Sequence, residues 1–238
     1  MKEMNLVTRR SLLERLGGLV TISLVAAPNS LLAQAQKQEQ RENETEVLPA
    51  EDLMREHGVL NRILLIYEEL AKRMKANKAL RPDVLADAAG IVHRFIEDYH
   101  ERLEEEQLFP RFEKAGKYVE LVRTLRDQHQ SGRCLTQYVK NRATAASLKD
   151  PGERGNVVKN LLLFIRMYRP NKAREDTVLF PAFHSIVSAE EYRKLGEEFE
   201  EREQFLFGKG GFEKIVEELG VLEKAVGINE LTQFTPKI

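Results

Sequence analysis

The sequence of 238 residues contains a single cysteine, Cys134, and almost no net charge. One cysteine cannot form a disulfide within the chain or supply a thiolate cage, so a bound metal would rest on imidazole and carboxylate ligands. The 37 Lys and Arg residues against 38 Asp and Glu residues give a formal charge of -1. This balance lacks the positive field that contacts with a phosphate backbone require, which argues against nucleic acid as a partner.

The chain also lacks an apolar run long enough for a stable membrane anchor. A mildly apolar stretch at residues 16–27 follows Arg9 and Arg10, and it is shorter than the ~20 residues that span a bilayer. Arginines, an apolar stretch and then small residues are the layout of an export signal. We therefore predict a twin-arginine signal over residues 1–35, a disordered linker over residues 36–48 and a periplasmic location. An ordinary secretory signal with two chance arginines is the alternative.

Glycine and proline are sparse beyond Pro49, and alternating β-branched residues are absent. Apolar and small residues instead recur at steps of three and four in four stretches, the spacing of amphipathic helices. The stretches begin at Leu53, Leu85, Val122 and Val157, and turn-forming residues gather at 77–82, 110–117 and 150–152. We predict an all-α protein whose residues 49–181 form an antiparallel four-helix bundle.

Two more helices are expected after the bundle. Ser188 and Glu191 have the spacing of a capping box, which predicts a helix to about residue 207. A last amphipathic helix is predicted over residues 212–226. We expect residues 182–238 to pack on the bundle as an extension.

The bundle sequence contains an internal repeat. Residues 100–110 align with residues 171–181 at a constant offset of 71, and each copy has a Glu followed by a second acidic residue and ends in Leu-Phe-Pro. His57 and His129 lie upstream, at a similar offset of 72. Each half therefore consists of a helix with one histidine on its apolar face, followed by a helix with the repeated motif. A pseudo-twofold axis between the two halves would bring the apolar faces of all four helices together.

His100 and Glu104 lie four residues apart, which places their side chains on one helix face, close enough to hold one ion. Glu175 occupies the matching place in the second copy of the repeat. Imidazole with bridging carboxylate on facing helices is a known way to hold iron or manganese in a bundle core. Two interior glutamates also require a cation, because burial of an unpaired charge is strongly unfavourable.

These motifs, over roughly residues 50–181, resemble the hemerythrin-like cation-binding family. The resemblance implies a four-helix bundle with a non-haem di-iron centre, in a family whose members bind or sense dioxygen or handle iron. Carried over by position, the ligands are His57 and His100 for one iron, His129 for the second, and bridging Glu104 and Glu175, with Asp176 as an alternative to Glu175.

One position departs from the family pattern, because Asn171 stands where a histidine is expected. An amide oxygen is a weaker ligand than imidazole, and Lys172 adds a positive charge beside it. Three outcomes follow: a di-iron site with Asn171 or water in the vacant position, a single metal at the His57 and His100 end, or no metal.

The remaining polar residues receive structural interpretations. His93 is interpreted as a hydrogen-bonded core residue and His184 as a surface residue. Solvated faces are predicted for Glu101, Glu105 and Glu106, and core positions for Tyr67, Tyr99 and Tyr168, whose hydroxyls could orient a ligand.

The leading functional hypothesis is an exported iron protein that binds dioxygen or a related small ligand, or that stores or senses iron. The rival is a metal-free bundle that serves as an interaction protein, with a partner that the sequence does not identify. A weak oxidase or peroxide-consuming activity is the third hypothesis. Motifs of hydrolases and nucleotide-binding enzymes, such as Gly-x-Ser-x-Gly and the Walker loop, do not occur in the sequence.

Overall fold

The computed structural model describes residues 48–237, so the predicted export signal and almost all of the predicted linker lie outside the described residues. Every regular element of the described part is a helix. The long helices are α3 (Pro49–Lys75), α4 (Pro82–Ile91), α7 (Val119–Arg142), α9 (Pro151–Arg174), α11 (Ala189–Phe207) and α12 (Gly211–Ala225). The short ones are α5 (Glu101–Leu103), α6 (Phe109–Ala115), α8 (Ala145–Lys149), α10 (Phe180–Phe183) and a 3-10 helix, η4 (Leu231–Phe234). Within this described range, no helix combines the length and apolar character that a membrane crossing requires.

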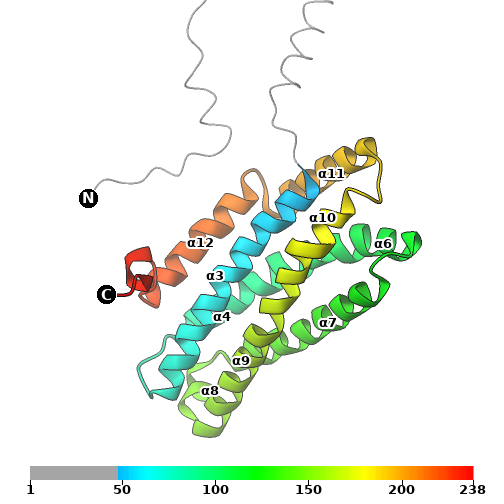
Figure 1. Ribbon diagram of the computed structural model, residues 1–238. Helices are drawn as coiled ribbons and strands as arrows, with labels where there is room; N and C mark the ends of the chain where they lie inside the picture. Colours follow the sequence, from blue (N-terminus) through cyan, green and yellow to red (C-terminus); the bar gives the residue numbers. More distant parts are fainter. Residues whose placement is uncertain (1–47, 238) are drawn as a thin grey trace, which may run out of the picture. The chain divides into compact units, whose positions relative to one another are not determined.

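Four helical rods form the bundle: α3, the rod from α4 to α6, α7, and the rod from α9 to α10 (Figure 1). Helices α3 and α7 both pack against α9, and α4 packs against α7 and α3, which closes the ring. The interior between the rods is apolar over most of its length, with fully buried side chains such as Phe95, Phe109 and Phe164. The predicted all-α four-helix bundle is confirmed.

The ends of α3 follow from its sequence. Pro49 occupies the first turn, where its missing N–H costs nothing. Acidic Glu51 and Asp52 lie in that turn, and the last turn carries three basic residues, as the helix dipole favours. Leu60, Leu64 and the other stripe residues of α3 are buried, so the predicted periodicity corresponds to the buried face of the helix.

The second and fourth rods contain widened π-helical turns. They are η1 (Val92–His100) and η2 (Glu104–Leu108) in the second rod and η3 (Glu175–Leu179) in the fourth. The turns η2 and η3 end directly before the two Phe-Pro pairs, and Phe109 N–H bonds to the carbonyl of Glu104 instead of the residue four back. Proline cannot donate a backbone hydrogen bond and crowds the preceding turn, and a widened turn accommodates both effects.

The break predicted at residues 110–117 is therefore placed too early. The second rod continues through Pro110 to Ala115, and it ends where Gly116 adopts a left-handed conformation with φ of 63°. Pro110 does not stop the rod, because it lies in the first turn of α6, where a missing N–H is tolerated, and directly follows the widened turn.

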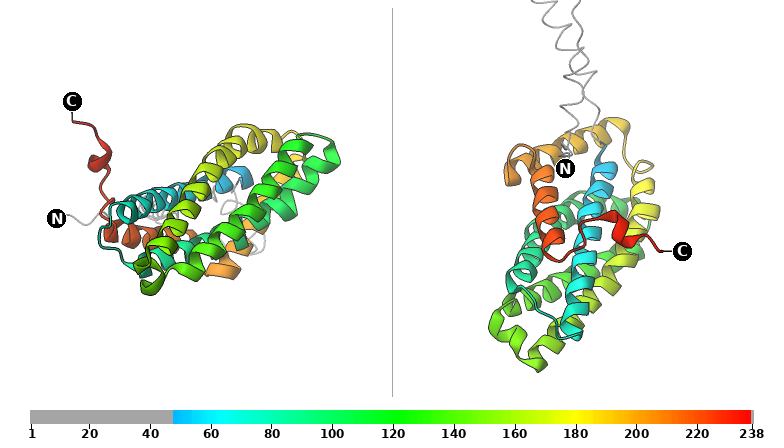
Figure 2. Two further views of the ribbon diagram at one scale, coloured as in Figure 1. Left: turned by 90° about the horizontal axis from the view of Figure 1, so that it is seen from below. Right: turned by 90° about the vertical axis from the view of Figure 1, so that its left-hand side faces the viewer.

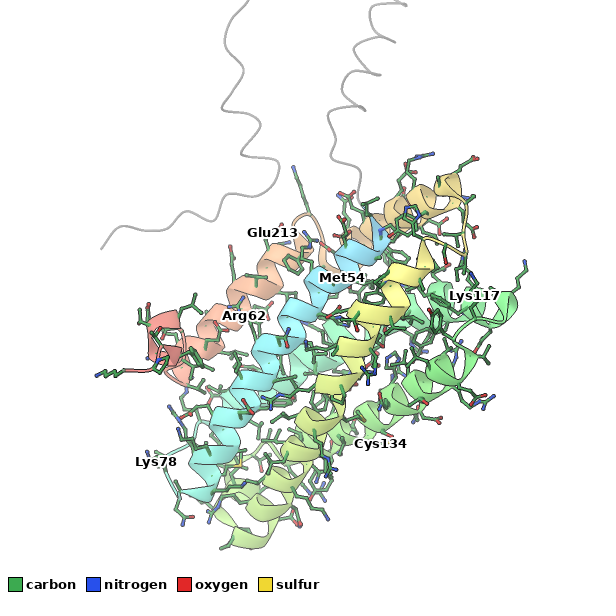
Figure 3. All side chains as sticks on the ribbon, viewed as in Figure 1. Met54, Arg62, Lys78, Lys117, Cys134 and Glu213 are labelled. Atoms are coloured by element: carbon green, nitrogen blue, oxygen red, sulfur yellow. The ribbon has the colours of Figure 1, made fainter. Side chains whose placement is uncertain are left out.

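Helices α11 and α12 pack against α3, and α12 also contacts α4. Figure 2 shows α12 beside α3. Arg62 of α3, labelled in Figure 3, donates two hydrogen bonds of 2.7 Å to the carboxylate of Glu223 on α12. At the start of α11, Ser188 Oγ accepts a hydrogen bond from Glu191 N–H at 3.1 Å, which is one half of the predicted capping box. The Glu191 side chain does not complete the box, because it accepts a hydrogen bond of 2.9 Å from Arg111.

An aromatic layer joins the C-terminal helices to the second rod. Phe207 lies 5.5 Å from Phe95 and 5.4 Å from Tyr99 between ring centroids, and Phe212 lies 6.3 Å from Phe95. Behind this layer, Tyr99 donates a hydrogen bond of 3.0 Å to Glu56 in the bundle interior. The C-terminal helices thus cover one side of the bundle.

Candidate metal centre

Three imidazoles from three rods meet in the core, those of His57 on α3, His100 at the end of η1 and His129 on α7. His57 Nε2 lies 3.4 Å from an oxygen of Glu175, and His100 Nε2 lies 3.8 Å from an oxygen of Glu104. His129 Nε2 lies 3.5 Å from Glu104 and 3.7 Å from Glu175. These separations exceed those of normal hydrogen bonds. They suit pairs of ligand atoms that each lie about 2 Å from a shared metal ion.

The other ring nitrogen of each histidine faces a carboxylate. The pairs are His57 Nδ1 with Asp176 at 2.7 Å, His100 Nδ1 with Glu56 at 2.7 Å, and His129 Nδ1 with Glu105 at 3.1 Å. A carboxylate that accepts a hydrogen bond from Nδ1–H fixes the tautomer and the ring orientation, which leaves Nε2 with a lone pair for a cation. Metal-ligating histidines have this arrangement as a rule.

Glu104 and Glu175 lie between the imidazoles and are 0% and 1% exposed. Both carboxylate oxygens of Glu104 and Oε1 of Glu175 have no hydrogen-bond partner. Unpartnered carboxylate oxygens at this depth are costly unless a cation compensates them. The donor set, which is made of imidazole nitrogen and carboxylate oxygen, fits a metal such as iron.

The electrostatics of the centre show what a cation would replace. Burial and the nearby Glu175 raise the pKa of Glu104 well above its usual value. Burial would also raise the pKa of Glu175, but contacts with His129 and His57 outweigh it and lower that pKa to about 2. Burial would lower the pKa of His57, but Asp176 and Glu175 outweigh it and raise that pKa to about 10. Protons therefore balance the charge of the metal-free centre, and a bound metal would displace them.

The predicted ligands form two groups that share one carboxylate. His57, His100 and Glu104 form the first group, and Glu104, His129 and Glu175 form the second; within each group the potential ligand atoms lie within 4.8 Å of one another. Glu104 therefore occupies a bridging position. Asp176 lies on the outer side of His57, with 29% of its side chain exposed, and does not face the shared interior.

Asn171 is buried in α9, and its Nδ2 donates a hydrogen bond of 3.1 Å to Gln128 Oε1 on α7. Gln128 also lines a groove of about 690 Å³ between α7 and α9, together with Leu163 and Met167. Cys134, labelled on α7 in Figure 3, lies in the same groove and is exposed. Gln128 therefore separates the groove from Asn171, the position where the fourth rod lacks a histidine.

The prediction of solvated faces is wrong for Glu101 and Glu105, and Glu106 is exposed as predicted. Glu101 is 1% exposed, and Glu105 is partly buried against His129. A regular helix turns about 100° per residue, which would carry Glu101 away from the face of His100; the widened turn η1 changes this register. Glu97, Glu101 and Glu105 are spaced four residues apart, and this spacing was the sequence signal that could have indicated that they share one helix face.

The interpretation of His93 as a core residue is also wrong. Its side chain is 43% exposed, and its Nδ1 lies 3.2 Å from Glu97 Oε2. His184 is exposed, as predicted. Sequence reasoning gave no role to Glu56, whose contact with His100 is visible only once the first and second rods are packed together.

Gly132 on α7 leaves the space that the hydroxyl of Tyr168 occupies. A Cβ atom at Gly132 would lie 1.9 Å from that hydroxyl, which donates a hydrogen bond of 2.6 Å to Glu101. We expect Gly132→Ala to push Tyr168 off Glu101 and to lower the free energy of unfolding by about 1–3 kcal/mol, measured by chemical denaturation. Gly155→Ala is the control, because nothing lies within 4 Å of a Cβ there. It should stabilise α9 by up to about 1 kcal/mol, and equal effects at the two positions would contradict this account.

Comparison with known proteins agrees with this geometry. The family model described as Hemerythrin HHE cation binding domain matches residues 48–183. A protein of Mycobacterium bovis and two of Mycobacterium tuberculosis, all described as uncharacterized, are each 42% identical to this chain over 233 residues. The aligned region covers 97% of this chain and 91% of each relative. No solved structure matches the chain.

Proposed function

This chain belongs to the hemerythrin HHE cation-binding family, and on that premise we propose that it is a non-haem iron protein that binds dioxygen or a related small ligand. His57, His100 and Glu104 would hold one iron, and His129 and Glu175 would hold the second, with Glu104 shared between them. Asp176 would support His57 from its Nδ1 side.

One observation carries the proposal. Three imidazoles direct Nε2 toward the same two buried carboxylates while each Nδ1 meets a separate carboxylate. A purely structural histidine needs only one such partner. The unpartnered oxygens of Glu104 and Glu175 support the same conclusion, because buried carboxylate oxygens without a cation would destabilise the core.

The residues on and beside the fourth rod support binding of a small ligand at the proposed second metal position. Asn171 is a weaker ligand than imidazole, and the groove between α7 and α9 lies next to it through Gln128. A bound iron would supply the electrons for binding dioxygen, and the histidines and glutamates of the centre would hold that iron in place. Storage or sensing of iron would use the same residues.

We also propose that the chain is exported to the periplasm by its N-terminal segment, residues 1–35. A signal of the twin-arginine type exports folded proteins, which would allow iron to be inserted before export. A reporter fusion of this segment that requires the twin-arginine route for export would support the assignment, and export by the general secretory route would contradict it.

Measurement of metal per chain tests the function. Protein purified after iron-replete expression should contain up to two irons, and its absorption spectrum should change when dioxygen is admitted to the reduced protein. His57→Ala should lose metal, whereas the control His93→Ala, which removes a partly exposed imidazole bound to Glu97, should keep it. Absence of metal from the wild-type protein would overturn the proposal in favour of a metal-free interaction protein.

A further inference from the structure

Glu101 is a buried carboxylate that the proposed ligand set does not use. It is 1% exposed, and it belongs to the short helix α5 between two widened turns of the second rod. Its Oε1 accepts a hydrogen bond of 2.6 Å from the Tyr168 hydroxyl, and Arg133 Nη2 lies 3.0 Å from Oε2. Burial of Glu101 in addition to Glu104 and Glu175 is expensive, and a single partly exposed arginine compensates only part of its charge.

Glu101 lies on the His129 side of the centre. Potential ligand atoms of Glu101, Glu105 and His129 lie within 4.8 Å of one another. Arg133 joins the two carboxylates, at 3.0 Å from Glu101 and 2.8 Å from Glu105. Since Glu105 already holds Nδ1 of His129, Glu101 is the carboxylate of this group that has no imidazole partner of its own.

The fourth rod fixes Glu101 from the other side. Tyr168 lies three residues before Asn171 on α9, so the two residues share one helix face about one turn apart. Gly132 provides the space for the Tyr168 hydroxyl. Helix α9, which carries Asn171 in place of a histidine, therefore also positions, one turn earlier, the carboxylate of Glu101 from the second rod across the bundle.

We propose that Glu101 replaces the missing fourth-rod histidine as a ligand of the second metal. This inference rests on the proposed function. The second position would then combine His129 with carboxylates of Glu101, Glu104 and Glu175, while the first combines two imidazoles with Glu104. Tyr168 and Arg133 act as positioning residues, because hydrogen bonds to a ligating carboxylate orient it and tune its strength.

Titration of the full, metal-free chain with Co²⁺, followed by calorimetry and by metal analysis after dialysis, tests the assignment. Wild-type protein should bind two ions, and Glu101→Gln should bind one. Glu97→Gln is the matched control, because Glu97 is a buried carboxylate one turn earlier that contacts His93 instead of the His129 group. This variant should still bind two ions. Adding Asn171→His to Glu101→Gln should restore the second ion, because the imidazole returns to the fourth rod.

The outcomes separate this inference from the proposed function. Two ions in Glu101→Gln, or one ion in the wild-type protein, would overturn the assignment of Glu101 while metal binding stands. No ion in the wild-type protein would overturn both. A double variant that stays at one ion would also contradict the exchange of one ligand for the other. If Glu101→Gln loses its helical circular dichroism, Tyr168→Phe replaces it and should weaken the second ion about 10–100-fold; unchanged affinity there would overturn the inference.

Discussion

In the metal-free protein at pH 8, Glu104→Gln is expected to raise the melting temperature, whereas in the iron-loaded protein the same change should remove metal and lower it. Without a metal, folding must either bury the charge of Glu104 or take up a proton from solution, because burial and Glu175 raise its pKa. A glutamine avoids that cost, which we expect to be about 1–3 kcal/mol. This gain corresponds to about 2–12 °C for a chain of this size. With metal present, loss of the shared carboxylate should reduce the content to at most one iron per chain.

The control for this reversal is Glu106→Gln. Glu106 lies two residues away on the same rod, but it is exposed and pairs with Arg202 on the surface. Exposed pairs contribute about 0–1 kcal/mol, so this change should shift both forms slightly and in the same direction. A Glu104→Gln protein that is less stable than wild type in both the metal-free and the iron-loaded state would contradict the role of Glu104 as a metal ligand.

The metal-free protein should be most stable between pH 4.5 and 6.5, the ordinary pKa values of Glu and His. The pKa of His57 is raised from 6.5 to about 10, so the stability contributed by its proton is present below pH 6.5 and is lost as the pH rises towards 10. The pKa of Glu104 is raised above its ordinary 4.5, so its contribution is full below pH 4.5 and falls as the pH rises from there, which adds to the alkaline loss. The pKa of Glu175 is lowered to about 2, so its contribution is present above pH 4.5 and disappears on acidification. Scanning calorimetry of chelator-treated protein should show a melting temperature about 5–10 °C lower at pH 9 than at pH 6.

Metal reverses the alkaline part of this profile. Ions compete with the protons on His57 and Glu104, so the apparent metal affinity should rise about tenfold per pH unit for each proton displaced. His57→Gln should flatten the alkaline decline of the metal-free protein, and His93→Gln should leave it unchanged. A wild-type profile that is flat between pH 6 and 9 would contradict the protonation of His57 and Glu104 inferred for the metal-free protein.

Periodicity and repetition were sufficient to predict the fold. Steps of three and four from Leu53, Leu85, Val122 and Val157 predicted the four rods, because a long helix buries one stripe whatever its partner is. The repeat ending in Leu-Phe-Pro indicated that the two halves of the bundle are built in the same way. The sequence could not show that its prolines continue the rods, because that depends on a backbone bond to the residue five positions back.

The candidate site was only partly accessible from the sequence. His57, His100 and His129 stand out because they fall on buried stripes, and Glu104 and Glu175 because they repeat. Glu101 and Glu105 were missed because a run of acidic residues is usually solvated and the spacing of four was not given weight. Glu56 was missed because its contact with His100 joins two different rods. Sequence patterns describe the position of a residue on its own helix, whereas the contacts of these glutamates join side chains from different rods.

The family match ends at residue 183, before the two helices that bury Phe95 and Tyr99. A fragment cut at that boundary would open the aromatic layer to water and expose the hydroxyl that holds Glu56 behind His100. The domain that the family model matches is therefore smaller than the unit that encloses His100. The C-terminal helices cover the side of α3 and α4, whereas the groove lies on the side of α7 and α9, where its lining residue Gln128 accepts a hydrogen bond from Asn171.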